Sequence, residues 1–330
     1  MRLSLIICTF MRPKSLFSLL ASVENQIRKP DEVIIVDGSL NDETKKLINS
    51  SSFSFNLKYF LVDQANRGLT LQRNFGISKV NPQTDLISFL DDDLILLEDY
   101  FNEIILTFKN FESAIGVGGI DLVENRYFKK EPNRNYSSFN FFELDGWVSK
   151  EPLRYKVRKI WKLMSDNQPG IVPHFGHGRS DFPPNKKTYQ VEHFMGGIAT
   201  YKNKLFKHIS FSSYFQGYGL YEDFDFCLRA LDFGELFVNT TAQVRHYHEP
   251  SGRPNYFKYG KMVVRNGWYV WNLRYPDNTF INKVKWHLIT LILAHLRLIN
   301  SITGPNRVIS LHDYFGRIFG WFSLFFRTPK

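Results

Sequence analysis

The sequence predicts an α/β protein with a mostly parallel sheet and helices on both of its faces. Within the first third of the chain, short uninterrupted apolar segments alternate with segments of helical character, as in parallel sheets that are covered on both sides. Polar and acidic side chains follow several of the apolar segments directly. Ligands of such sheets bind beyond the carboxyl ends of the strands, so these side chains are the first candidates for a functional site.

Four strands and three helices account for the alternation. The apolar segments that we expect to be strands are residues 3–8, 32–36, 57–62 and 86–90. The helices that we expect between them are residues 13–25, 42–48 and 71–78. Asp42 marks the start of the second helix, because a short acidic side chain can accept a hydrogen bond from the first helical turn.

The pattern changes after residue 120. Residues 121–190 scatter proline, lysine and aromatic side chains without a clear period, which indicates a long insertion or a partly mobile cover. Core-like patterning returns over 191–250, and residues 251–330 predict two or three helices that end in an aromatic and basic tail. We therefore expect one large domain over 1–250 followed by a helical module.

The charge balance favours acidic partners. The chain has 330 residues, 43% of them hydrophobic, and a formal net charge of +10, which suits nucleic acid, nucleotide phosphates or an anionic membrane face. Aromatic residues make up 16%, and many lie near Lys and Arg in the C-terminal half. This mixture fits a membrane interface better than a DNA groove, and the sequence contains no nucleic-acid recognition motif.

Neither export nor a membrane span is expected. The apolar run at residues 3–10 is short and no small-residue cleavage site follows it. The segment 280–302 is interrupted by charged residues and histidines, so it falls short of the ~20 apolar residues of a spanning helix. Cys8 and Cys227 lie in separate apolar runs, which predicts a reducing cytosol rather than a disulfide framework.

Three consecutive carboxylates, Asp91, Asp92 and Asp93, follow the expected strand at 86–90. On an extended backbone Asp91 and Asp93 point to one side and Asp92 to the other. Clustered carboxylates repel one another and are tolerated best around a cation, and their hard oxygen atoms suit Mg²⁺ or Mn²⁺. A solvated turn or a helix cap is the alternative, although a cap requires only one aspartate.

Five short motifs in this order resemble family 2 glycosyltransferases, which have the GT-A fold. The motifs are Ile7–Phe10 with Arg12, Val33–Ser39, Asn66–Gly68, Gln72–Gly76 and Phe89–Asp93. The resemblance is clear over residues 2–120 and sparser to about 250. It implies a nucleotide-binding half over 1–120, a cover over 121–190 and an acceptor half over 191–250.

The resemblance also implies contacts with a nucleotide sugar. The expected residues are Thr9, Arg12, Asp37, Asn66, Arg73, Asp91, Asp92 and Gly197. Asp37 would accept a hydrogen bond from the base, which favours UDP or dTDP as the carrier. Alternatives stay open, since Asp37 could shape a turn and Arg73 could be a solvated helix residue.

Glu222 and Asp223, which follow two glycines, match the family's acidic pair. The resemblance makes Asp223 the general base that takes the proton of the acceptor hydroxyl, while Glu222 orients the acceptor. A helix N-terminus favours the ionised form of Asp223, and burial among aromatic residues opposes it. The alternative is the acidic bias that many helices show in their first turn.

The resemblance also implies that a histidine can join Asp91 and Asp93 in the expected metal site. His246 and His248 both follow an apparent strand, and their spacing puts both rings on one side of an extended segment. Imidazole is more compatible with Mn²⁺ than with Mg²⁺. The sequence favours His248 without excluding His246.

The C-terminal segment is both aromatic and basic. Residues 314–327 alternate rings with Gly and Arg, a composition that suits the headgroup region of a membrane or, alternatively, a dimer interface. The patterns and the family resemblance together predict an inverting glycosyltransferase. The resemblance and the tail imply that it acts at the inner face of the bacterial plasma membrane, on a lipid-linked glycan in surface polysaccharide synthesis. The alternatives are a non-catalytic scaffold of the same fold, a sugar-1-phosphate nucleotidyltransferase and, from charge alone, a nucleic-acid binder.

Overall fold

The computed structural model describes residues 1–165, 167–215, 217–248 and 255–329. Its contacts divide the chain into two compact units. The first comprises Met1–Asn125 and Asp181–Gly252, and the second comprises Arg126–Ser180 and Arg253–Lys330. The segment 126–180 therefore belongs with the C-terminal helices rather than with the sheet that carries its neighbours in sequence.

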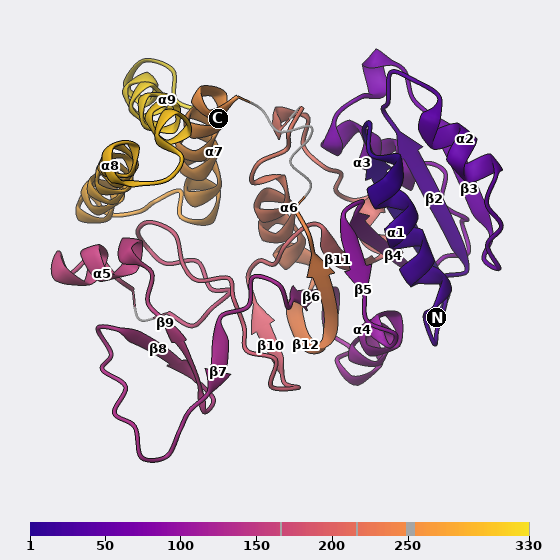
Figure 1. Ribbon diagram of the computed structural model, residues 1–330, viewed down its shortest axis with the longest axis horizontal. Coiled ribbons are helices and arrows are strands. Elements are labelled where there is room, and N and C mark those ends of the chain that lie inside the picture. Colours follow the sequence, from indigo (N-terminus) through magenta and orange to yellow (C-terminus); the bar gives the residue numbers. More distant parts are fainter. Residues whose placement is uncertain (166, 216, 249–254, 330) are drawn as a thin grey trace. The chain divides into compact units, whose positions relative to one another are not determined.

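The described residues of the first unit form one nine-stranded sheet (Figure 1). Its strands are β1 (Leu3–Thr9), β2 (Glu32–Asp37), β3 (Leu57–Leu61), β4 (Leu86–Asp91), β5 (Leu94–Leu96), β6 (Ala114–Asp121), β10 (Thr188–Val191), β11 (Ile198–Lys202) and β12 (Glu235–His246). They run in the order β10-β12-β6-β11-β4-β1-β2-β3, and β5 pairs with β12. Strands β4, β1, β2 and β3 are parallel to one another, as β12 is to β6, while β11 is antiparallel to both β4 and β6.

Helices cover both faces of this sheet. They are α1 (Pro13–Glu24), α2 (Glu43–Asn49), α3 (Leu69–Ile77), α4 (Tyr100–Asn110) and α6 (Glu222–Ala230). Apolar residues of α1 and α4 join Leu5 and Ile7 of β1 in one core cluster. The next side chain along β1, Ile6, points to the opposite face, where a Cβ on Gly76 of α3 would lie 2.7 Å from it. The fold class predicted from the sequence is confirmed.

The strands and helices predicted in the first 91 residues occur in the predicted order. Four strands end within one residue of the prediction, and α3 begins two residues earlier than expected. The expected cover over 121–190 differs more. Its last residues form β10, which pairs with β12 at the edge of the main sheet. The sequence did not predict this strand, because Thr188–Val191 is short and has no apolar pattern of its own.

The second unit contains a small sheet and four helices among its described residues. The strands β7 (Tyr127–Lys129), β8 (Phe141–Leu144) and β9 (Trp147–Lys150) form an antiparallel sheet in the order β7-β9-β8. The helices are α5 (Leu153–Ile160), α7 (Tyr256–Arg274), α8 (Phe280–Thr303) and α9 (Arg307–Phe326). Within the described part of the chain, none of the helices has the length and apolar content needed to cross a membrane.

Glycines set the contact between α7 and α9. A Cβ on Gly316 of α9 would overlap the carbonyl oxygen of Phe257, and one on Gly320 would lie 3.0 Å from that of Lys261. The two helix backbones therefore approach more closely than larger residues would permit. Trp271 and Trp286 are buried beside this contact, with Leu324 of α9 in the same cluster.

Candidate functional site

Three parallel strands end side by side with polar residues. In the register of the sheet Cys8 lies beside Asp91, and Thr9 lies beside Asp37. The ends of β1, β2 and β4 thus bring Thr9, Asp37 and Asp91 to one edge, as the alternation of strands and helices predicts.

Asp92 is held by the loop that follows β1, whose Arg12 also lies 3.6 Å from Asp93 Oδ2. Asp92 Oδ2 accepts a hydrogen bond from Thr9 Oγ1 (2.6 Å), and Asp92 Oδ1 lies 3.0 Å from Arg12 Nη1. Burial raises the pKa of Asp92 to about 6, although Arg12 and Thr9 act in the opposite direction. Thr9 and Arg12, both predicted nucleotide contacts, therefore position this carboxylate.

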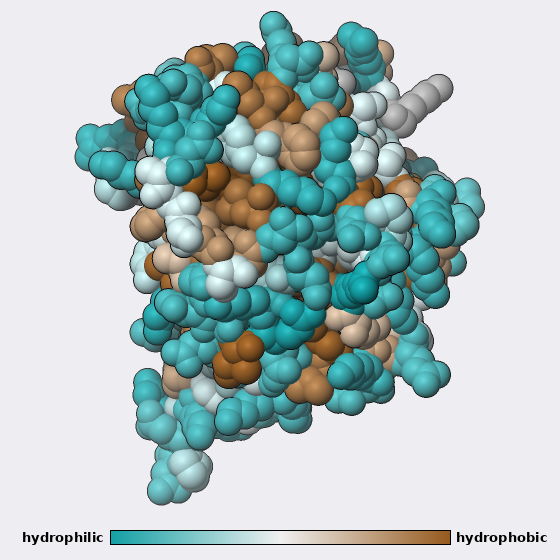
Figure 2. All heavy atoms as spheres, turned by 90° about the vertical axis from the view of Figure 1, so that its right-hand side faces the viewer, coloured by the Kyte–Doolittle hydropathy of each residue, from teal (hydrophilic) through white to brown (hydrophobic). Residues whose placement is uncertain are grey.

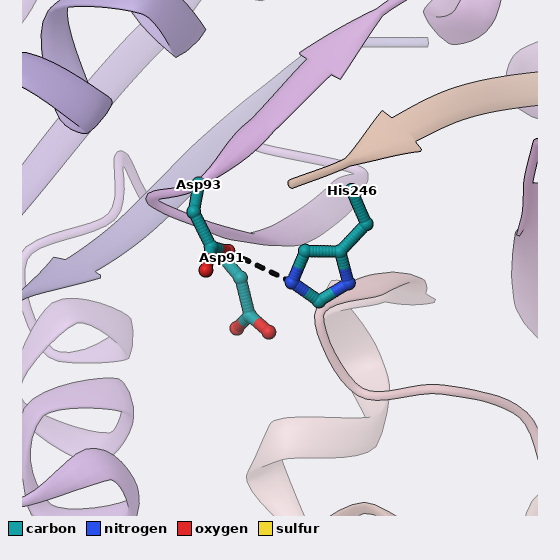
Figure 3. A group of neighbouring side chains, drawn as sticks. All are labelled: Asp91, Asp93 and His246. Atoms are coloured by element: carbon teal, nitrogen blue, oxygen red, sulfur yellow. Dashed lines mark ion pairs between the residues drawn. The ribbon is translucent and has the colours of Figure 1, made fainter. Parts of the chain in front are cut away.

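Asp91, Asp93 and His246 form a group with the composition of a metal site (Figure 3). Each offers a ligand atom within 4.8 Å of those of the other two, and His246 Nε2 lies 2.9 Å from Asp93 Oδ1. Two carboxylates and an imidazole suit Mn²⁺ and, less well, Mg²⁺. Among the described residues, none gives the buried Nδ1 of His246 a hydrogen-bond partner.

The acidic surroundings of His246 govern its charge. Burial acts to lower the pKa of His246, but Asp93, Asp91 and Asp121 outweigh burial and raise it. The backbone N–H of His246 donates to Asp121 Oδ1 (3.0 Å). Asp121 ends β6 and was not among the predicted site residues, although a carboxylate directly after a buried strand is the signal that singled out Asp37 and Asp91.

The structure groups His246, and not His248, with the aspartates. His248 Nε2 lies 3.3 Å from Glu124 Oε1, and its ring centroid is 3.9 Å from that of His246. The expectation that both rings lie on one side assumed a regular extended segment, but β12 ends at His246 and His248 has a φ of 47°. The regular extension of the strand therefore does not continue to His248, which is not part of the group formed by Asp91, Asp93 and His246.

The guanidinium of Arg73 links the acidic cluster that contains Asp91 to the one that contains Glu222. It forms an ion pair with Glu222, donates to the carbonyl oxygen of Gly196 (3.1 Å) and lies 3.6 Å from Asp91 Oδ1. Only 3% of the Arg73 side chain is exposed. The sequence predicted a phosphate contact, whereas the structure occupies this guanidinium with internal partners. Burial raises the pKa of Glu222, and Arg73 opposes that shift.

Asp223 is held by backbone at the start of α6. Its Oδ2 accepts from the N–H of Gly196 (3.0 Å) and its Oδ1 from the N–H of Phe224 (2.8 Å). Burial raises the pKa of Asp223 more strongly than these hydrogen bonds lower it. A carboxylate that is fixed in position and has a raised pKa has the properties of a general base.

Gly196 and Gly197 lie between the two clusters. A Cβ on Gly196 would lie 2.6 Å from the Cβ of Asp223, and one on Gly197 would overlap the carboxylate of Asp91. The N–H of Asp91 also donates to the carbonyl oxygen of Gly197 (3.1 Å). Glycine is required here because two carboxylates pack against the backbone from opposite sides.

Asp37 and Asn66, the other predicted nucleotide contacts, have local hydrogen bonds. Asp37 is fully buried and accepts from the N–H of Ser39 (2.8 Å) and from the hydroxyl of Tyr59 (2.7 Å). Asn66 is bound to Asp63 through its backbone and side-chain N–H groups. Asp37 ends β2 and Asn66 lies in the segment that follows β3, and their contact with a nucleotide stays a prediction.

These features of fold and site are those of a family of sugar-transferring enzymes. Residues 4–210 match the model of the family described as glycosyl transferase family 2, so the chain belongs to that family. The resemblance found in the sequence motifs is thereby confirmed. The mixed α/β fold with its mostly parallel sheet is of the GT-A type.

One curated relative is the GalNAc(5)-diNAcBac-PP-undecaprenol beta-1,3-glucosyltransferase of Campylobacter jejuni, which is 33% identical over 97 residues. The match covers 29% of this chain and 31% of that relative. Similar solved structures include S. aureus TarS 1–349, with 13% identity, a TM-score of 0.48 and coverage of 98% of this chain and 91% of TarS. GalNAc-T7, solved with UDP, GalNAc and Mn²⁺, has 15% identity and a TM-score of 0.49, covering 81% and 49% of the two chains.

Proposed function

We propose that the chain transfers a sugar from a nucleotide diphosphate, UDP or dTDP, to an acceptor hydroxyl with inversion at the anomeric carbon. The observation that carries this proposal is the position of Gly196 and Gly197. They lie between the group that could bind a metal ion, which includes Asp91, and the carboxylate of Asp223. Gly197 packs on Asp91, while the N–H of Gly196 holds Asp223. A donor phosphate and an acceptor hydroxyl need these two kinds of group side by side.

Asp91, Asp93 and His246 would hold Mg²⁺ or Mn²⁺, and the ligand geometry described above supports this set. The ion supplies positive charge for the diphosphate leaving group. Thr9 and Arg12 hold Asp92, and the Arg12 guanidinium also lies 3.6 Å from Asp93. Three adjacent carboxylates are in this way divided between two tasks.

Asp223 would take the proton of the acceptor hydroxyl. Its two backbone hydrogen bonds fix the direction of the carboxylate, and a raised pKa makes it a better proton acceptor than an exposed aspartate. Glu222 is turned toward Arg73. Its role would therefore be to position the start of α6, rather than to contact the acceptor.

We further propose a lipid-linked glycan as the acceptor and the inner face of a bacterial plasma membrane as the place of action. The curated relative from Campylobacter jejuni is named for an undecaprenol-linked substrate, which supports this class of acceptor. Residues 1–250 would form the catalytic part of the chain and 251–330 the membrane-associating module, with most of the cover at 121–190 in the same compact unit as that module.

The test is a thermal-shift panel of UDP, dTDP, GDP and CMP, with and without Mn²⁺, on the wild type and on Asp93→Ala. A ligand that binds only the folded state raises the melting temperature. We expect stabilisation by UDP or dTDP that requires Mn²⁺ and is lost in Asp93→Ala. Glu98→Ala, which removes a nearby carboxylate outside the cluster, is the control and should keep the shift. If no nucleotide stabilised the folded wild type, the scaffold alternative would replace this proposal.

A further inference from the structure

The two units carry opposite charge. The first, comprising 1–125 and 181–252, has 19 Lys and Arg against 25 Asp and Glu, a formal net charge of −6. The second, comprising 126–180 and 253–330, has 23 against 7, a net charge of +16. The basic character of the chain therefore belongs entirely to the second unit, which contains none of the acidic clusters described above.

Helix α9 buries its small residues and exposes its large ones. The buried side chains are Ser310, Asp313, Gly316, Gly320 and Leu324. At about 100° per residue they share one face, and two of them are the glycines that allow α7 to approach. Most amphipathic helices do the reverse and use their largest apolar side chains to pack on the core.

The opposite face of α9 is an exposed apolar stripe. We define the α9 stripe as Val308, Leu311, Phe315, Phe319, Phe322 and Phe326, spaced by three or four residues. Their exposed fractions run from 36% to 89%, and at about 100° per residue all six fall within an arc of about 80°. No acidic residue lies within that arc.

Cations surround the stripe without interrupting it. Arg307 and Arg327 are exposed and flank the two ends of the helix. The ammonium of Lys261, on α7, lies 5.0 Å from the ring centroid of Phe319. Apolar rings bordered by Lys and Arg are the pattern of a helix that lies in a lipid headgroup region.

Charge decides between the occupants that such a stripe could have. A second copy of the chain would bring one unit of +16 against another, and juxtaposed like charges are costly. A polyanion such as nucleic acid would be bound by cations along its path, whereas the stripe itself has none. An anionic bilayer satisfies both features, because its phosphates attract the flanking cations and its acyl boundary receives the rings.

We propose that the α9 stripe is the surface by which the protein docks on anionic lipid, with the helix lying in the plane of the membrane. The phenyl rings would enter the boundary between headgroups and acyl chains, and Arg307, Arg327 and Lys261 would contact lipid phosphates. The inference deepens the proposed function by naming the lipid class and the residues that bind it. It rests on that function only in that a lipid-linked acceptor explains why the protein would dock on a membrane.

Vesicle flotation tests the proposal with the full-length protein. The lipids are phosphatidylcholine alone and phosphatidylcholine mixed with phosphatidylglycerol. The variant is Phe319→Ser, Phe322→Ser and Phe326→Ser combined. The matched control is Ile27→Ser, Leu61→Ser and Leu106→Ser, which removes three apolar side chains of the first unit that are also exposed.

We expect the wild type to float with phosphatidylglycerol vesicles, and high salt to weaken that binding. The α9 variant should bind at least about tenfold less, because three rings that would enter the membrane are lost, while the control variant should bind as the wild type does. Equal binding by all three proteins, or no binding by the wild type, would overturn the proposal. So would a wild-type dimer in sedimentation that the α9 variant abolishes, since the occupant would then be a second copy.

The two proposals fail separately. Nucleotide stabilisation by UDP or dTDP is measured without lipid and should be equal in the α9 variant and in the wild type. If nucleotide binding were absent but vesicle binding followed the stripe, glycosyl transfer would be wrong and the docking surface would stand. If nucleotide binding were present and flotation ignored the stripe, the docking surface alone would be wrong.

Discussion

The carboxyl edge of the main sheet and the exposed face of α9 break the usual rule of burial in opposite directions. At the sheet edge the charged side chains Arg73, Glu222 and Asp92 are buried. On α9, phenylalanines such as Phe322 and Phe326 are exposed. Folding alone would favour neither arrangement. Positions at which a chain departs from its own stabilising pattern are where functional constraints are expected.

The two regions also differ in how the departure is supported. Each of these buried charges at the sheet edge has a hydrogen-bond or ion-pair partner on another segment. The side chains of the α9 stripe are instead largely exposed. On the face shown in Figure 2, hydrophilic residues dominate and apolar ones form small separate patches. The four predictions below ask whether the buried charges are held for chemistry or for stability, and whether the exposed rings are needed for the fold.

Asp223→Asn should have the largest effect. It keeps the shape of the side chain but removes the proton acceptor, so turnover should fall by about 10²- to 10⁴-fold with nucleotide stabilisation retained. The measurement is turnover of UDP-sugars with release of UDP. Asp232→Asn, which changes an exposed aspartate just after α6, is the control. Unchanged turnover in a folded Asp223→Asn protein would show that another group is the base.

Arg73→Ala should have the largest effect on stability. Removal of the guanidinium leaves Glu222 and the Gly196 carbonyl without their partner, and losing one member of a buried ion pair costs about 3–5 kcal/mol. Arg28→Ala removes an exposed pair with Asp31 and should cost at most about 1 kcal/mol. Urea denaturation measures both. Similar losses for the two variants would mean that the buried ion pair contributes no more to stability than the exposed pair.

Glu32→Gln separates a structural buried carboxylate from the catalytic ones. Burial acts to raise the pKa of Glu32, but hydrogen bonds from Asn81, Lys58 and Ser4 outweigh burial and lower it. Because the folded pKa lies below the unfolded value of about 4.3, the stabilisation is present above that pH and is lost as pH falls through the folded pKa.

The expected loss of stability in Glu32→Gln is therefore about 1.5–3 kcal/mol at neutral pH. The difference from the wild type should shrink as the medium becomes more acid. Denaturation midpoints measured from neutral to acid pH check both statements, and turnover at neutral pH should be unchanged. A difference that stayed constant with pH would refute the role of the ionised form.

Phe326→Ser should have the smallest effect on the fold. The side chain is 89% exposed, so its loss should change the free energy of unfolding by less than about 0.5 kcal/mol. Leu324→Ser, two residues earlier on the buried face, should cost at least about 2 kcal/mol. Equal losses would show that the rings of the stripe belong to the core of the second unit.

Much of the sheet could be predicted because its strands are largely apolar segments that end at a polar side chain. β1, β2 and β4 each have that form, and burial on both faces leaves little freedom in where such a strand begins and ends. β10 has no such signal, since Thr188–Val191 gains its place only from pairing with β12. Tertiary pairing of this kind is invisible to local patterns.

Residues of the site were predictable as members of motifs, but not in their contacts. The sequence indicated that Arg73 and Glu222 matter, yet a separation of 149 positions gives no sign that they form an ion pair. The choice between His246 and His248 depended on where β12 ends. That end is set by the pairing of His246 with Leu94 of β5. The spacing of residues within β12 gives no information about this pairing.

The glycine contact between α7 and α9 restricts rotation of α9 about its own axis. Turning the helix by one residue, about 100°, would move a side chain into the space beside the carbonyl of Phe257 that only Gly316 leaves open. The contact therefore permits only one rotational orientation of the helix about its axis. The direction in which the rings of the α9 stripe point is thus set by two glycines on the opposite, buried face of the helix.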